Sequence, residues 1–170
     1  PDFEVAAMCG ISGIMYKNSS AQGLAPIGDD LVRMLESMTH RGKDSSGITV
    51  AGESIEEDLI IRIWADTGAQ TEDVLSRSEE TVLRAGGVFK SRRSWDGYLR
   101  LTVNYEGEIP PLAEALLSIE GVQIHSIGEA SEVVKDVGTP ATIDGKHQVG
   151  QLKGTHGIGH VRMATESQVD

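Results

Sequence analysis

Apolar residues recur along the chain with two periods, which predict helices and strands. Between residues 98 and 105 apolar and polar residues alternate strictly, as in a strand with one buried face. After Asp29 and Asp30, either of which could cap a helix, apolar residues follow at helical spacing, and Gly42 lies just past the expected end. That stripe consists of Leu31, Met34, Leu35 and Met38.

The other elements follow from the same patterns together with glycine and proline positions. Strands are expected at 9–16, 46–51, 58–64, 122–127 and 157–164, and helices at 71–84, 110–119 and 131–136. We expect 46–51 and 58–64 to form a hairpin and residues 98–127 to form a β-α-β unit. We also expect a loop from 137 to 153 and a solvated loop at the basic cluster 90–93.

Composition and charge narrow the classes of function. A length of 170 residues fits one domain, and 26 acidic against 15 basic residues give a formal net charge of −11. This acidity argues against nucleic acid and an anionic membrane surface as partners. No apolar run approaches the roughly 20 residues of a membrane-spanning helix, and the acidic N-terminus lacks the features of a signal peptide. We therefore expect a cytoplasmic protein.

Cys9 is the only cysteine, which excludes an internal disulfide and a metal site built from cysteines of this chain. His156 and His160 are four residues apart, but the intervening glycines disfavour a helix, so we expect neither a metal nor a cofactor. Cys9 could act as a nucleophile whose own α-amine accepts the thiol proton. It could instead be a small buried residue, the more common role of a lone cysteine, which its position and flanking glycines alone favour.

Two further stretches combine charged residues with glycine. Residues 40–47 could place a guanidinium and backbone amides beside the first strand, or form a polar helix-to-strand turn. They do not form a phosphate-binding loop, because Asp44 stands where that motif needs Ser or Thr. In residues 154–166, Arg162 followed by Thr165 suits capture of a small carboxylate, since a guanidinium binds a carboxylate through two hydrogen bonds.

Three ordered motifs resemble the class II glutamine amidotransferase domains of the N-terminal-nucleophile (Ntn) hydrolase superfamily. They are MCGISGI at 8–14, HRGKDSSG at 40–47 and GHVRMAT at 159–165. Residues 132–140, 154–160 and 164–167 look most like amidotransferase subunits related to glutamate synthase, including those of the N-methylglutamate-synthase type. The resemblance implies an α+β fold, an αββα sandwich of antiparallel sheets that is incomplete in this chain.

The resemblance also implies a glutaminase reaction with ammonia transfer. Cys9 would attack the side-chain amide of glutamine, form a γ-glutamyl thioester and release ammonia to a synthase subunit or domain. Its freed α-amine would be the general base. The implied substrate-binding positions are Arg41 and Gly42 beside Cys9, Arg162 on the substrate α-carboxylate, and Thr165 with the backbone of Met163.

The resemblance divides the chain into expected parts. Residues 1–8 would be a propeptide or a cloning remnant, because Cys9 needs a free amine. Residues 9–170 would be the front part of the domain, with a subdomain inserted at about 66–153. The missing C-terminal part, with an Asn-Gly oxyanion segment, would then be a partner, and we expect an oligomer. The alternative is a non-catalytic regulatory or interaction domain that keeps Cys9 unprocessed.

Overall fold

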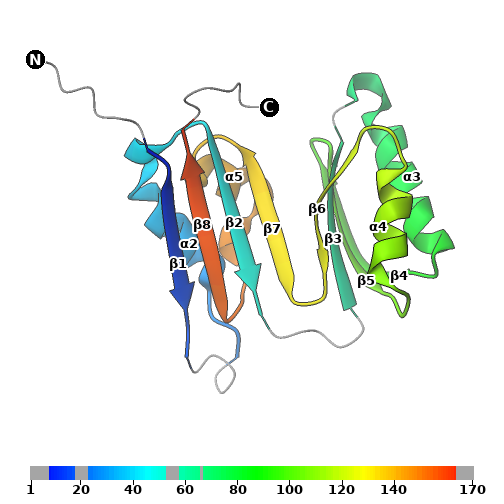
Figure 1. Ribbon diagram of the computed structural model, residues 1–170, viewed down its shortest axis with the longest axis horizontal. Helices are drawn as coiled ribbons and strands as arrows, with labels where there is room; N and C mark the ends of the chain where they lie inside the picture. Colours follow the sequence, from blue (N-terminus) through cyan, green and yellow to red (C-terminus); the bar gives the residue numbers. More distant parts are fainter. Residues whose placement is uncertain (1–7, 18–22, 53–57, 66, 164–170) are drawn as a thin grey trace, which may run out of the picture. The chain divides into compact units, whose positions relative to one another are not determined.

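The computed structural model describes residues 8–17, 23–52, 58–65 and 67–163. These residues form two four-stranded antiparallel sheets and four α-helices, which confirms an α+β fold (Figure 1). The chain divides into two compact units. Unit 1 comprises Pro1–Glu53 and Val133–Asp170, and unit 2 comprises Ser54–Glu132. Along the described ranges, no helix has both the length and the apolar character needed to cross a membrane.

The sheet of unit 1 brings together the first and the last strand of the described chain. Its strand order is β1-β8-β2-β7, made of β1 (Gly10–Met15), β8 (His156–Arg162), β2 (Ser45–Ala51) and β7 (Ser131–Val137). The late strand β8 lies between β1 and β2 and pairs antiparallel with both. As a result, the first and last of the three sequence motifs occupy neighbouring strands.

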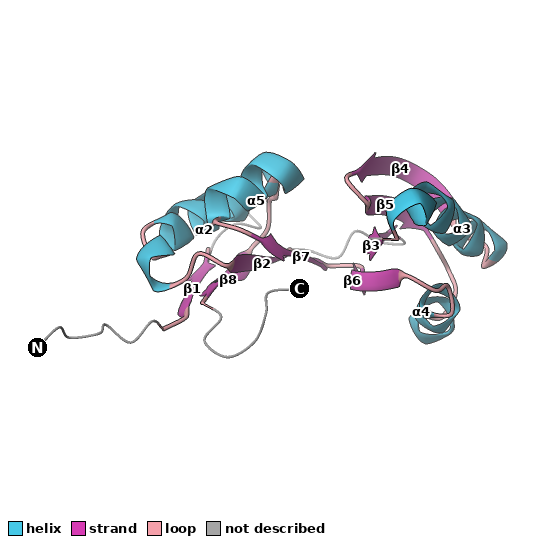
Figure 2. Cartoon of the chain, turned by 90° about the horizontal axis from the view of Figure 1, so that it is seen from above, coloured by secondary structure: helices cyan, strands magenta, loops and turns pink. Residues whose placement is uncertain are grey.

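Two helices, α2 (Ile27–Glu36) and α5 (Pro140–His147), cover one face of this sheet (Figure 2). Helix α2 packs closely on β8, because a Cβ at Gly157 would meet Leu31 at 2.8 Å and one at Gly159 would meet Leu35 at 2.6 Å. The core of unit 1 consists of Ile27, Leu31, Val32, Leu35, Ile48, Val50, Val134, Ile143, Val149 and Val161.

The start of α2 differs from the prediction. The helix begins at Ile27 after Pro26, so Asp29 and Asp30 lie in its first turn instead of capping it. Carboxylates there interact favourably with the positive end of the helix dipole. Met38 lies beyond the helix end, and Gly42 follows a separate 3-10 helix, η1 (Thr39–Arg41).

Unit 2 is a second sheet with its own helices and core. The strand order is β4-β5-β3-β6, made of β4 (Val88–Trp95), β5 (Tyr98–Asn104), β3 (Asp58–Ala65) and β6 (Val122–Gly128), with helices α3 (Thr71–Arg84) and α4 (Ile109–Leu117). The alternating strand and the β-α-β unit are confirmed as β5, α4 and β6. Both strands pair antiparallel with β3, which lies between them.

The predicted hairpin is wrong, because β2 and β3 belong to different sheets. All residues of β3 except Trp64 are buried, and a strand buried on both faces needs neighbours on both edges. Its neighbours β5 and β6 come from later in the sequence.

Three other expectations are also corrected. Residues 131–136, predicted as a short helix, belong to strand β7, consistent with the β-branched valines there. The predicted loop 137–153 contains α5, whose N-cap Thr139 accepts a hydrogen bond from the Thr142 amide and precedes Pro140. Lys90–Arg93, predicted as a solvated loop, lies in β4, a polar strand at the sheet edge.

Candidate functional site

All three sequence motifs meet at one end of the unit 1 sheet. Strand β1 begins there at Gly10, β8 ends there at Arg162 and β2 begins there at Ser45, with Gly10 opposite Val161 and Ser45 opposite Arg162. Continuing the first register by one residue places Cys9 opposite Arg162. Figure 1 shows these strand ends together at the upper edge of the sheet. We call this edge the motif end.

Cys9 lies at the exposed start of β1. The residue is exposed and its thiol is free. The next residue, Gly10, packs closely, because a Cβ there would meet Val161 at 3.0 Å and the sulfur of Met38 at 3.3 Å. Cys9 is therefore not the small buried residue that the sequence left as an alternative, and its thiol is accessible to a small molecule.

The second motif approaches the motif end through η1 and the turn that follows. Gly42 is buried against the main chain of Arg162, where a Cβ would come within 2.5 Å of the carbonyl carbon. The amide of Asp44 donates a hydrogen bond to the Arg162 carbonyl oxygen at 3.1 Å. These contacts fix the HRG segment beside the end of β8.

Two polar atoms of η1 are buried without a hydrogen-bond partner, Oγ1 of Thr39 and Nε of Arg41. Buried polar atoms in folded proteins nearly always have partners, so a partner from outside the described residues is expected for each. A guanidinium nitrogen needs an acceptor such as a carboxylate or a carbonyl oxygen. Arg41 is thus a candidate binding residue at the motif end.

Arg162 and Met163 complete the described part of the motif end. Both are half-buried, and Arg162 is the last residue of β8. Thr165, the other expected binding residue, lies outside the described residues. The structure therefore brings Cys9, Arg41, Gly42, Arg162 and Met163 to one edge of the sheet and describes no position for Thr165.

The two closely spaced histidines lie on a strand and not on a helix. His156 and His160 belong to β8, where His156 is exposed and His160 half-buried. Throughout the described ranges, no group of three or more His, Cys, Asp or Glu residues could hold a metal ion.

The sequence analysis missed a group of charged residues in unit 2. Arg62 and Arg100, on β3 and β5, both contact the carboxylate of Glu132. The available signal was Arg62 itself, because an arginine within the apolar run of β3 must be buried and therefore needs a partner.

Comparison with known proteins gives two similar sequences. A protein of Methanothermobacter thermautotrophicus, provisionally named a glutamine amidotransferase, is 34% identical over 168 residues, covering 96% of this chain and 54% of that protein. The glutamine amidotransferase-like protein GlxB of Rhizobium meliloti is 31% identical over 163 residues, covering 95% of this chain and 52% of GlxB. The chain thus spans about half the length of these relatives. No family model matches the chain.

Proposed function

We propose that the chain is part of a class II glutamine amidotransferase, in which the motif end binds and hydrolyses glutamine. The similarity to a protein provisionally named a glutamine amidotransferase and to a glutamine amidotransferase-like protein supports this reaction class. The observation that carries the proposal is the meeting of Cys9, the HRG segment and Arg162 at one sheet edge. These motifs are distant in the sequence, yet Cys9, Gly42 and Arg162 lie at the same end of one sheet.

In the proposed reaction, the Cys9 sulfur attacks the carbon of the glutamine side-chain amide. The α-amine of Cys9 accepts the thiol proton and returns it to the departing ammonia as the carbon–nitrogen bond breaks. Water then cleaves the γ-glutamyl thioester to give glutamate and the free thiol. This route requires removal of residues 1–8, because a Cys9 nitrogen bonded to Met8 is an amide and not a base.

The substrate's α-carboxylate is assigned to Arg162, whose guanidinium can form two parallel hydrogen bonds with it. Arg41 is proposed to shape the binding site beside Cys9. This role is supported by its Nε, which is buried and has no hydrogen-bond partner among the described residues. Thr165 and the backbone of Met163 are proposed to seat the rest of the glutamine. Ammonia would pass to a synthase subunit or domain related to glutamate synthase.

The proposed architecture is the αββα sandwich of Ntn hydrolases. One face of the unit 1 sheet carries α2 and α5, whereas Ile11, Met15 and Ile158 are exposed on the strands β1 and β8. Exposed apolar residues gathered on one face favour burial against another part of the protein. A second sheet on this face would complete the sandwich.

The proposal is tested by glutamine hydrolysis and by mass spectrometry of the same full-length preparation. We expect glutamate and ammonia to form only when Cys9 is the first residue. We also expect a glutamine-like electrophile such as a diazoketone to alkylate Cys9. The Cys9→Ser variant should lose both reactions, whereas Ser37→Ala, which alters an exposed serine beyond α2, should retain them. Activity in a preparation that begins only at Pro1 would refute the α-amine mechanism.

The alternative is a non-catalytic regulatory or interaction domain of the same fold with an unprocessed Cys9. Intact-mass measurement separates the two functions. Residues 1–8 retained in every molecule, together with absent glutamine hydrolysis, would favour the alternative.

A further inference from the structure

Three arginines lie side by side across the sheet of unit 2. Arg93 on β4 is opposite Arg100 on β5, and Arg100 is opposite Arg62 on β3. Residues directly opposite one another in a sheet point to the same face, and neighbouring strands are about 4.8 Å apart. The three side chains therefore start as one row on a single face. This concentration of positive charge occurs in a chain with a formal net charge of −11.

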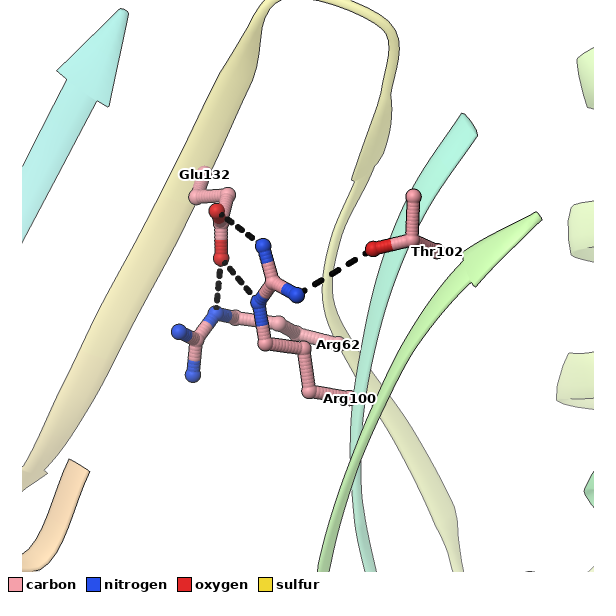
Figure 3. Close-up of polar contacts among 4 residues, drawn as sticks. All are labelled: Arg62, Arg100, Thr102 and Glu132. Atoms are coloured by element: carbon pink, nitrogen blue, oxygen red, sulfur yellow. Dashed lines mark hydrogen bonds and ion pairs between the residues drawn. The ribbon is translucent and has the colours of Figure 1, made fainter. Parts of the chain in front are cut away.

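One carboxylate, that of Glu132, contacts two of these arginines (Figure 3). Arg100 donates from Nη2 to Oε1 at 2.7 Å and from Nε to Oε2 at 2.9 Å, a bidentate pair. Arg62 donates from Nε to Oε2 at 2.7 Å. Three hydrogen bonds therefore reach the Glu132 carboxylate, and two of them come from Arg100.

Arg62 keeps unused hydrogen-bonding capacity. Its two terminal nitrogens point away from Glu132 in Figure 3, and within the described part of the chain they have no acceptor. Arg62 is only 5% exposed, yet neither terminal nitrogen belongs to the fully buried unpaired atoms, so both still reach solvent. The Nε of Arg62 is thus held by Glu132, while its two terminal donors still reach solvent.

Arg62 shares the Glu132 carboxylate with Arg100. Burial lowers the pKa of Arg62 below its ordinary value, the Glu132 carboxylate opposes that shift, and the positive charges of Arg100 and Arg93 add to it. A buried cation that shares one carboxylate with a second cation is costly unless another anion approaches.

We propose that Arg62, flanked by Arg100 and Arg93, binds an oxyanion, namely the phosphate or carboxylate group of a small molecule. The two free terminal donors of Arg62 match two oxygens of such a group, as in other guanidinium–oxyanion pairs. Glu132 positions the site, because its carboxylate holds the guanidinium of Arg100 and accepts a hydrogen bond from Nε of Arg62. The residues of this site belong to unit 2, whereas the glutamine-binding role is proposed for residues of unit 1.

An aromatic row beside the arginines supports the site. Trp95, Tyr98 and Trp64 are opposite one another on the same three strands, two residues along from the arginines. The guanidinium of Arg93 lies 4.3 Å from the centre of a Trp95 ring, which fixes this side chain over the sheet. Apolar rings next to the arginines lower the local polarity and so strengthen the attraction between guanidinium and anion.

The test uses low-millimolar inorganic phosphate and, separately, acetate as probes of the full-length protein. Thermal unfolding is measured against sodium chloride at equal ionic strength, because phosphate also stabilises proteins without binding a site. Arg62→Met removes the proposed donors and leaves Glu132 paired with Arg100. Arg92→Met is the matched control, since Arg92 is a neighbour of Arg93 on β4 whose partner is Glu79.

We expect phosphate or acetate to raise the unfolding temperature of the wild type and of Arg92→Met. The dissociation constant of the probe should rise about ten- to hundredfold in Arg62→Met, because the variant loses one or more charged hydrogen bonds to the anion. A response to phosphate alone or to acetate alone identifies which oxyanion the site takes. Equal responses in Arg62→Met and Arg92→Met, or no response of the wild type beyond that to chloride, would overturn the proposal.

A second variant keeps the test decisive if Arg62→Met does not fold. Glu132→Gln removes the negative charge that competes with the bound anion. Arg62 and Arg100 are then both available to the anion. We expect the probe that binds the wild type to stabilise Glu132→Gln more strongly than the wild type. A salt bridge with a purely structural role predicts no such gain, so an equal or smaller response would contradict anion binding.

Discussion

Gly42 lies against the main chain of Arg162, so close that a methyl group on Gly42 would come within 2.6 Å of the Arg162 carbonyl oxygen. The backbone of Gly42 is extended, with φ −170°, which any residue can adopt. The requirement for glycine is therefore steric. It sets how closely the turn after η1 approaches the end of β8, and thereby where Arg162 lies relative to Cys9.

Gly42→Ala should destabilise the protein by about 1–3 kcal/mol, because the added methyl group must push two backbone segments apart. Chemical unfolding measures the change. In the proposed enzyme, the same displacement should lower glutamine hydrolysis. Gly145→Ala is the control, since Gly145 lies in α5 with open space around its Cβ position. Because alanine favours a helix more than glycine does, Gly145→Ala should leave the free energy of unfolding unchanged or raise it by up to about 1 kcal/mol. Equal stability of both variants would contradict the packing argument.

Arg162→Lys should raise the KM for glutamine about tenfold or more, with a smaller change in kcat. Lysine keeps the charge but cannot form the two parallel hydrogen bonds of a guanidinium with a carboxylate. Steady-state kinetics on the processed enzyme measure the two constants. The matching control is Arg33→Lys, because Arg33 forms an exposed ion pair with Asp29 on α2. An equal rise of KM in both variants would show that Arg162 does not bind the substrate.

The contribution of Glu132 to stability should depend on pH. Burial alone would raise the pKa of Glu132, but the hydrogen bonds and charges of Arg100 and Arg62 outweigh burial, so its pKa is lowered. A carboxyl whose pKa is lower in the folded state stabilises the protein above its unfolded pKa, near 4.3 for glutamate. That stability is lost as the pH falls through the folded-state value.

Glu132→Gln should therefore cost about 3 kcal/mol at pH 7 and progressively less below about pH 4. Urea unfolding followed by tryptophan fluorescence suits this measurement, since both tryptophans, Trp64 and Trp95, belong to unit 2. Glu120→Gln, which changes an exposed glutamate between α4 and β6, should show little difference at either pH. A cost for Glu132→Gln that does not change with pH would exclude the ionised carboxylate as its source.

Leu101→Ala should destabilise unit 2 by about 2–5 kcal/mol, because Leu101 is fully buried in its core and alanine leaves a cavity. The same substitution at Leu117, which is 59% exposed on α4, should cost less than about 1 kcal/mol. Tryptophan fluorescence again follows the unfolding of this unit. Similar costs at the two positions would show that Leu101 does not pack as described.

Local patterns predicted the elements that carry strong local signals. The alternating strand β5 is predictable because its periodicity is complete within one segment, and the helix at 71–84 because Gly86 and Gly87 mark its end. The residues of the motif end are predictable from three short motifs, although only the sheet register shows that Cys9 directly precedes the strand that pairs with β8. Periodicity gives no information on the order of strands in a sheet.

The missed elements depend on contacts between distant segments. Strand β4 has few apolar residues, since it is an edge strand, and its Arg92 pairs with Glu79 on α3. Helix α5 has little apolar periodicity, and its main signal was Thr139 before Pro140. The cluster of Arg62, Arg100 and Glu132 joins residues up to 70 positions apart, so no local pattern could pair them.

Strands β2 and β7 are neighbours in the sheet, and unit 2 is inserted between them in the sequence. The amide of Gly138 donates to the Asp44 carbonyl, so the end of β7 lies beside the start of β2. The insertion connects the other ends of these two strands along the chain. Unit 2 thus occupies the place of a hairpin turn. A shortened chain with about two to five turn residues between Gly52 and Val133 should retain the unit 1 sheet. The insertion could therefore be gained, lost or exchanged in evolution without rebuilding the sheet that holds Cys9.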